Sequence, residues 1–168
     1  MKKFDYDQEI KVGIADLKTA NSPKRIITLG LGSCVGIAIF DTKFKVGGLA
    51  HIMLPDSTQF STVTNSFKFA DLAVPILIAE LKNMGASYSR MRARIAGGAQ
   101  MFSFADKKRT TLNIGERNIN KVKEVLKEQG ITLLAEEVGG NIGRTMILDT
   151  DTGKVFIRSV GRTLKELQ

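Results

Sequence analysis

Two side chains stand out first, because the 168-residue sequence contains a single cysteine and a single histidine. Cys34 follows Gly30-Leu-Gly-Ser33 at the start of an apolar run, and His51 lies seventeen residues later in a second apolar run. An imidazole that takes the proton of a thiol generates a thiolate, which is a strong nucleophile for acyl transfer. We therefore expect a Cys34–His51 dyad, although each residue taken alone also suits an ordinary buried position.

The glycines before the cysteine favour a sharp turn at the nucleophile. Gly30 and Gly32 permit backbone conformations that other residues rarely adopt. The backbone N–H groups of Ser33 and Cys34 would then be free to hold the oxyanion of a tetrahedral intermediate. A serine nucleophile would need the same His51 as its general base, so the thiol is the better candidate nucleophile.

Other kinds of site fit the sequence less well. A zinc site built from cysteine and histidine needs three or four ligands, and one residue of each type is present. The glycine-rich segments match neither a phosphate-binding loop nor the dinucleotide fingerprint. We expect no metal and no organic cofactor.

The elements that must position this pair indicate an α+β fold. Apolar residues at helical spacing predict helices over residues 65–84 and 118–129. Adjacent strands without a helix between them favour a layered sandwich of mixed sheets, with helices on the outside, over a doubly wound parallel fold. A turn is expected at residues 44–48, and the whole of residues 1–168 is expected to form one domain. Short apolar or alternating runs predict strands at residues 9–14, 25–31, 35–40, 49–54, 91–95, 131–138, 144–149 and 154–160.

The charge of the chain favours an acidic partner. Lys and Arg number 25 against 17 Asp and Glu, which gives a net charge of +8. Arg90, Arg92, Arg94 and the run Lys107-Lys108-Arg109 are candidate docking residues, although ordinary solvated charge would explain any one of them. Tryptophan is absent and two tyrosines are present, so the stacking residues of a nucleic-acid-binding surface are lacking. A basic nucleic-acid-binding module is thereby the weaker alternative.

The sequence carries no sign of a membrane segment. Its apolar runs are too short to cross a bilayer, and its first residues lack the apolar region of a signal peptide. A lone cysteine cannot form an internal disulfide, which suits a reducing compartment. We expect a cytoplasmic protein that does not insert into a membrane.

Five motifs together resemble the CheD family, the chemoreceptor glutamine deamidases. They follow one another between about Arg25 and Val160, and as a linked set they are far more specific than one glycine pattern. The resemblance implies hydrolysis of selected glutamine side-chain amides in chemotaxis receptors, giving glutamate. The motifs are Thr28-Leu-Gly-Leu-Gly-Ser-Cys-Val-Gly-Ile-Ala-Ile-Phe-Asp41, Gly47-Gly-Leu-Ala-His-Ile-Met-Leu-Pro55, Gly97-Gly-Ala-Gln-Met101, Ile114-Gly-Glu-Arg-Asn118 and Val138-Gly-Gly-Asn-Ile-Gly-Arg144.

The resemblance also implies roles for single residues. Cys34 would be the nucleophile, His51 the general base and acid, and Thr28 the residue that orients the imidazole. A straight strand would place Thr28 and Cys34 roughly 20 Å apart, so the chain must fold back at Gly30-Leu-Gly32 if this assignment holds. Ser33, Gln100 and Asn141 are the alternative orienting residues. The oxyanion and cleft candidates are Gly32, Ser33, Gly97, Gly98 and Asn141, and turn geometry alone would also account for the glycines.

The resemblance extends to fold and partners. It implies a sandwich similar to the catalytic domain of the cytotoxic necrotizing factor toxins. It implies the cytoplasmic helical domains of chemoreceptors as substrate and a CheC-type phosphatase as partner. The same dyad would also be able to cleave a glutamyl methyl ester. The alternative from another functional class is a protein that mainly binds receptors and the phosphatase, with weak catalysis.

Overall fold

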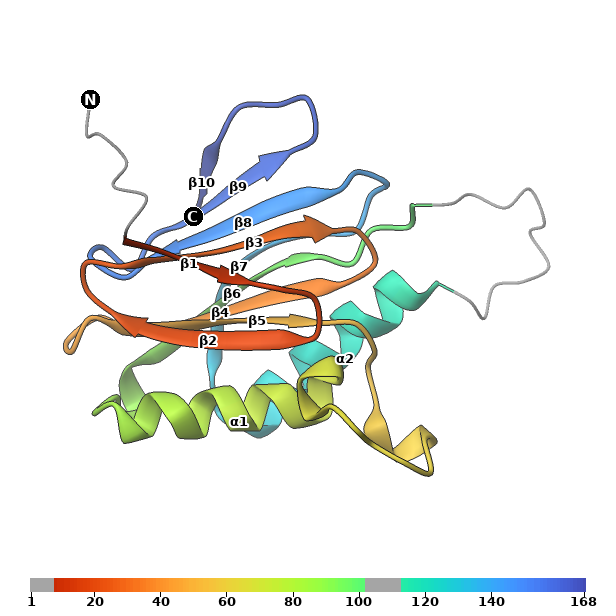
Figure 1. Ribbon diagram of the computed structural model, residues 1–168, viewed down its shortest axis with the longest axis horizontal. Helices are drawn as coiled ribbons and strands as arrows, with labels where there is room; N and C mark the ends of the chain where they lie inside the picture. The colour runs from red at the N-terminus through yellow and green to blue at the C-terminus, as the bar shows by residue number, and fades with distance from the viewer. Residues whose placement is uncertain (1–7, 102–112) are drawn as a thin grey trace.

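Two five-stranded β-sheets and a layer of helices make up the computed structural model, which describes residues 8–101 and 113–168 (Figure 1). Sheet A has the order β1 (Glu9–Val12), β3 (Arg25–Leu31), β8 (Arg144–Asp149), β9 (Val155–Ser159) and β10 (Lys165–Leu167). Sheet B has the order β2 (Asp16–Asn21), β5 (Val46–Ile52), β4 (Val35–Asp41), β6 (Met91–Gly97) and β7 (Thr132–Val138). Each sheet has one parallel pair, β1 with β3 and β6 with β7, among antiparallel neighbours. The predicted α+β sandwich of mixed sheets is confirmed.

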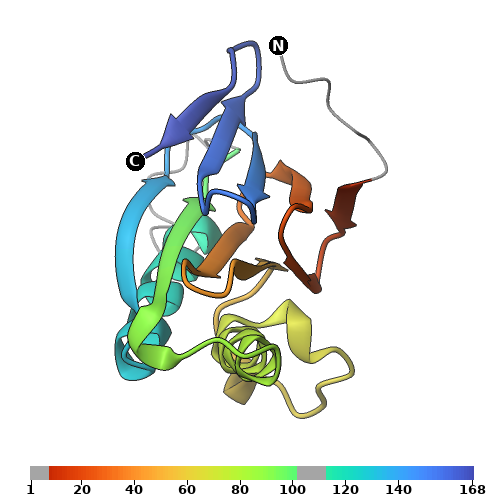
Figure 2. The same cartoon turned by 90° about the vertical axis from the view of Figure 1, so that its left-hand side faces the viewer.

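The helices α1 (Ala70–Asn83) and α2 (Ile114–Glu128) pack on one face of sheet B, and Figure 2 shows α1 nearly end-on beside the strands. One apolar cluster lies between these helices and sheet B, and a second lies between the two sheets. Because sheet B is covered on both faces, every residue of β4 and β5 is buried, and both strands read as continuous apolar runs. In the described part of the chain, no helix is both long and apolar enough to span a bilayer.

Several boundaries differ from the sequence prediction. The segment from Val46, predicted as part of a turn, is the start of β5. Gly48 is required there by packing and not by a turn, because a Cβ at this position would lie 2.4 Å from the side chain of Leu77 on α1. The first helix begins at Ala70, after a short 3-10 turn capped by Asn65. The second helix begins at Ile114, earlier than predicted, after an N-cap residue whose side chain accepts from the N–H of the third helical residue.

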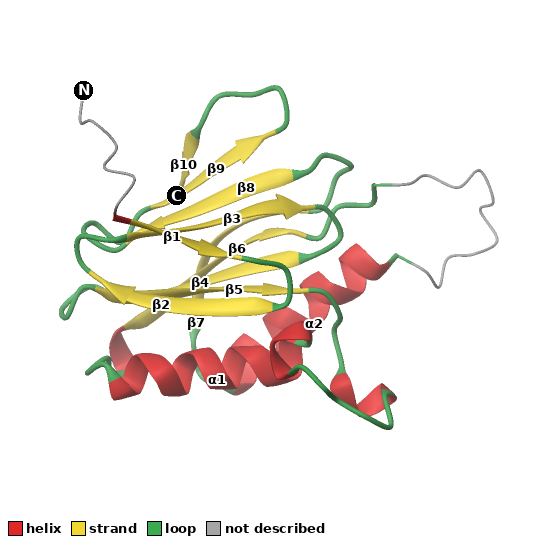
Figure 3. Ribbon diagram, in the orientation of Figure 1, coloured by secondary structure: helices red, strands yellow, loops and turns green. Residues whose placement is uncertain are grey.

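Two strands were not predicted at all. β2 and β10 both lie at the edges of their sheets (Figure 3). Few of their side chains are buried. A short edge strand has little apolar alternation to reveal it, because only part of one face meets the core.

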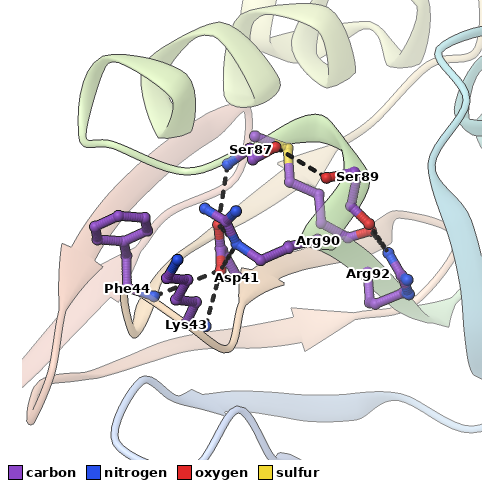
Figure 4. A network of polar contacts seen from close by, with 8 residues as sticks. Asp41, Lys43, Phe44, Ser87, Ser89, Arg90 and Arg92 are labelled. Atoms are coloured by element: carbon purple, nitrogen blue, oxygen red, sulfur yellow. Dashed lines mark hydrogen bonds and ion pairs between the residues drawn. The ribbon is translucent and has the colours of Figure 1, made fainter.

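A buried carboxylate fixes the end of β4 that lies farthest from Cys34. Asp41 is fully buried and accepts hydrogen bonds from the Arg90 Nε at 3.1 Å and from the N–H groups of Ser87 and Lys43 at 3.0 and 2.9 Å (Figure 4). Burial alone would raise the pKa of Asp41, but these hydrogen bonds outweigh it and lower the pKa. The central strand is thus tied to the α1–β6 connection at one end, and Cys34 precedes its other end.

Candidate active site

The chain folds back between Thr28 and Cys34, as the assignment of Thr28 requires. It runs along sheet A to Leu31, bends through residues 32–34 and enters sheet B as β4. Gly30 has a φ of 71°, and the N–H of Gly32 donates to the Gly30 carbonyl at 3.0 Å. The register of β3 against β8 is interrupted over the same residues. The turn places Thr28 in one sheet and Cys34 at the start of the facing sheet.

The imidazole of His51 is fully buried in β5 and contacts Thr28 across the space between the sheets. Its Nδ1 lies 2.7 Å from the Thr28 Oγ1, which is also 2.8 Å from the carbonyl oxygen of Val12. Because a carbonyl only accepts, the hydroxyl proton goes to Val12, and Nδ1 must carry the proton that Thr28 accepts. The unprotonated nitrogen of His51 is therefore Nε2. Among the described residues Nε2 has no hydrogen-bond partner, so its lone pair is free to act as a base.

Cys34 and His51 lie near each other in the register of sheet B. His51 pairs with Gly36, and the last pair of the ladder is Val35 with Ile52. Cys34 lies one residue beyond that pair, at the position diagonal to His51 just before β4 begins. Cys34 is half-buried and packs against the apolar cluster between the sheets, on the side from which His51 reaches Thr28. Diagonal neighbours are within reach of a long side chain such as histidine.

Burial keeps both members of the pair uncharged at rest. Desolvation lowers the pKa of His51 to about 4, so its imidazole is neutral at pH 7. Burial also raises the pKa of the Cys34 thiol, with a partial offset from a hydrogen bond of its own backbone N–H. The resting site therefore holds a protonated thiol and a neutral imidazole, so nucleophilic attack by the sulfur requires loss of the thiol proton.

The backbone around Cys34 is held by a second glycine loop. The N–H groups of Gly98 and Ala99 donate to the carbonyls of Cys34 and Gly32, each at 2.8 Å. A Cβ at Gly97, whose φ is 107°, would lie 2.2 Å from the Cys34 carbonyl oxygen. Gly97 and Gly98 therefore support the backbone of Cys34 through close approach of their own backbone.

The three alternative orienting residues make no hydrogen bond to His51 within the described residues. The Ser33 carbonyl accepts from Asn118, and Gln100 is exposed, with its side chain accepting from Asn113 at 3.3 Å. Asn141 is also exposed. It belongs to a loop that lies beside the Gly97 loop, because the Gly140 carbonyl accepts from the Gln100 N–H at 2.8 Å.

Asn118 is a site residue that the sequence prediction missed. It appeared only within a motif and as the expected start of a helix, yet its fully buried side chain contacts the carbonyls of Ser33 and Met53. An amide in a helix that is otherwise apolar on its inner face was the signal that could have identified it.

The candidate docking arginines are engaged within the protein. The Arg90 guanidinium pairs with the buried Asp41, and the Arg92 Nη1 donates to the carbonyls of Ser89 and Met91 at 2.9 and 2.8 Å. The Arg94 Nη1 donates to the Gly153 carbonyl at 3.2 Å. Lys107-Lys108-Arg109 lies outside the described residues.

The buried histidine makes a testable contribution to stability against acid. Its pKa is about 4 in the folded protein against an ordinary 6.5, so the unfolded chain binds this proton more readily. The free energy of unfolding should therefore fall by about 3 kcal/mol through His51 alone as the pH drops from 6.5 to about 4. Urea unfolding of the wild type and of His51→Gln across this range measures the difference. Equal pH dependence in the two proteins would contradict the assignment.

Comparison with known proteins identifies relatives over almost the whole chain. Residues 53–159 match the family described as CheD chemotactic sensory transduction. A protein of Clostridium acetobutylicum named probable chemoreceptor glutamine deamidase CheD is 59% identical over 167 residues, which cover 99% of this chain and 100% of the relative. A protein of Clostridium botulinum with the same name is 59% identical over 160 residues, which cover 95% of this chain and 98% of the relative.

Proposed function

Since the chain belongs to the CheD family, we propose that it is a protein-glutamine glutaminase that converts selected glutamines of chemoreceptors to glutamate. The observation that carries the chemistry is the hydrogen bond between His51 Nδ1 and Thr28, which leaves Nε2 as a free base on β5, the strand paired with the one that Cys34 precedes. The substrate class comes from the names of the relatives that share 59% of its sequence.

The reaction begins with attack of the sulfur on the glutamine carboxamide. His51 Nε2 takes the thiol proton as the bond from Cys34 Sγ to the carbonyl carbon forms, and the N–H groups of Ser33 and Cys34 receive the oxyanion. The imidazolium then protonates the amide nitrogen, the carbon–nitrogen bond breaks, and ammonia leaves a thioester on Cys34.

Hydrolysis of the thioester completes the cycle. His51 Nε2 deprotonates a water molecule, whose oxygen adds to the thioester carbon. The carbon–sulfur bond then breaks, the proton returns from His51 to the sulfur, and the side chain leaves as glutamate. No step requires a metal or an organic cofactor.

The depressed pKa of His51 favours the step in which the imidazolium acts as an acid, and it makes the neutral imidazole a weaker base in the other steps. An imidazolium whose pKa is about 4 is a strong acid, so it gives its proton readily to the departing nitrogen. Because the thiol of Cys34 is largely protonated, removal of its proton accompanies the attack and does not precede it.

Further parts of the proposal rest on the family resemblance and on charge. The net charge of +8 suits the acidic helical domains of receptors, and the free thiol suits a reducing cytoplasm. A CheC-type phosphatase as partner, hydrolysis of glutamyl methyl esters, and likeness to the cytotoxic necrotizing factor catalytic domain stay predictions.

Peptide mass spectrometry tests the proposal directly. Purified receptor cytoplasmic domains are incubated with the protein and digested, and selected glutamines are expected to appear as glutamates with release of ammonia. The matched control is the same protein treated with iodoacetamide, which alkylates thiols. Cys34 carries the single thiol of the sequence. Identical receptor spectra with treated and untreated protein would refute the deamidase proposal, and receptor binding without conversion would indicate a binding regulator.

Thr28→Val should lower kcat by roughly 10²-fold, because valine cannot accept the Nδ1 proton and the imidazole is free to change tautomer. Thr28→Ser keeps the hydroxyl and should stay within a few-fold of the wild type. Initial rates of ammonia release, with circular dichroism to verify folding, measure both. A serine variant as slow as the valine variant would show that the hydroxyl is not what matters.

A further inference from the structure

The side chain of Asn118 joins the two strands that carry the proposed catalytic pair. Its Nδ2 donates to the carbonyls of Ser33 at 3.0 Å and Met53 at 2.9 Å. The last residue pair between β4 and β5 is Val35 with Ile52, so both carbonyls lie just beyond the point where the strands bond to each other. One buried amide therefore continues the connection past the end of the ladder, next to Cys34.

This contact completes a set of three fixed carbonyls. Gly32 is held by the N–H of Ala99, Ser33 by Asn118, and Cys34 by the N–H of Gly98. In a trans peptide the C=O and the following N–H point in opposite directions. Holding the Ser33 carbonyl toward α2 therefore turns the Cys34 N–H to the other side.

That other side is the side of the sulfur. The Cys34 side chain packs against the apolar cluster between the two sheets, which covers the face of sheet B opposite α2. A donor beside the attacking atom is where the oxyanion of a tetrahedral intermediate would form.

The helix that carries Asn118 is held closely against the same loop. A Cβ at Gly115, one turn before Asn118, would lie 2.4 Å from the Gly98 carbonyl oxygen and 2.7 Å from that of Ala99. The amide donor and the two N–H donors thus belong to one closely packed unit behind the nucleophile.

Stability alone explains this amide poorly. Asn118 is fully buried, and its Oδ1 has no hydrogen-bond partner within residues 8–101 and 113–168. A buried acceptor without a partner is costly, and such groups in folded proteins call for a specific reason.

We propose that Asn118 is a positioning residue, which fixes the Ser33–Cys34 peptide so that the Cys34 N–H receives the oxyanion. The inference rests on the proposed function. The Asn118 side chain makes no hydrogen bond to the sulfur or to the imidazole in the described residues. In this proposal it nevertheless affects the transition state of acyl transfer, through the peptide that it holds.

The test compares two reactions of the same sulfur in Asn118→Leu, a variant of similar volume without donors. Deamidation passes through an oxyanion, whereas alkylation by iodoacetamide does not. We expect kcat for deamidation to fall roughly 10²-fold, the effect of losing one oxyanion donor, with KM within about twofold. The rate of alkylation of Cys34 should stay within about threefold of the wild type, because the thiol and His51 remain.

Thr150→Val is the matched control, since it removes another buried side-chain hydrogen bond, from Thr150 to the Lys24 carbonyl, near the opposite end of β3. It should leave both rates within about twofold. If Asn118→Leu does not fold, Asn118→Asp, which has the same shape and cannot donate when ionised, is judged by the same ratio of rates.

The outcomes separate the inference from the proposed function. A wild type that releases no ammonia from receptors refutes the function, and the inference falls with it. An active wild type with an unchanged kcat in the Asn118 variant refutes the inference alone. A variant in which alkylation and deamidation fall by the same factor also refutes it, because Asn118 would then serve the fold or the thiol and not the oxyanion.

Discussion

Replacement of Cys34 by alanine is expected to reduce deamidation of receptor glutamines to background, a loss of roughly 10⁶-fold. Alanine offers no nucleophile, and the sequence contains no second cysteine that could substitute for it. The rate is measured as ammonia release and as glutamate formation at each modified glutamine. Because Cys34 is small and half-buried, the melting temperature of the variant should stay close to that of the wild type.

Binding provides the control for this variant. Cys34→Ala should still bind receptor domains with an affinity close to that of the wild type, because only the sulfur is removed. Conversion by Cys34→Ala at the wild-type rate would show that another residue, or a contaminant, performs the chemistry. Loss of binding together with activity would indicate that the substitution had damaged the surface and not only the nucleophile.

Replacement of His51 by glutamine is expected to cost roughly 10⁴-fold in kcat. The thiol would have to ionise unaided, and burial holds its pKa above the ordinary value. The residual rate should therefore increase as the pH is raised toward that pKa, because only the thiolate fraction reacts. In the wild type the base is already neutral above about pH 4, so kcat/KM should fall through protonation of His51 only below that pH.

A pH series of kcat/KM for the wild type and His51→Gln measures both effects. Glutamine keeps a polar side chain of similar length, so circular dichroism should show the same fold. A wild-type acid limb near pH 6.5 would contradict the depressed pKa. Full activity in the variant would remove His51 from the mechanism.

The proposed catalytic pair could be nominated from the sequence because the sequence contains one cysteine and one histidine. The fold-back at Gly30 was also predictable, because a strand of that length could not otherwise bring Thr28 toward a histidine near Cys34. The proposed role of Asn118 was not predictable in this way. Its partners are main-chain carbonyls of Ser33 and Met53, which lie 85 and 65 positions away and which no side-chain pattern reveals.

The arginine-bearing strand shows the limit of alternation as a guide. Apolar and basic residues alternate along β6, and that pattern predicts one apolar and one basic face. In the folded chain this face turns toward sheet A, where Arg94 reaches the carbonyl of Gly153. Alternation of residue types predicts which side chains share a face of a strand. It does not predict that one face is covered by a second sheet, because that sheet is formed by residues far away in the sequence.

The apolar cluster around Cys34 also bears on the lifetime of the sulfur in the presence of peroxides. Hydrogen peroxide attacks thiolates, and a thiol kept protonated by burial is attacked slowly. With no second cysteine in the sequence, a sulfenic acid at Cys34 would have no internal thiol to resolve it as a disulfide. Burial that makes the resting sulfur a poor nucleophile thus also shields it from a lesion that this chain cannot reverse by itself.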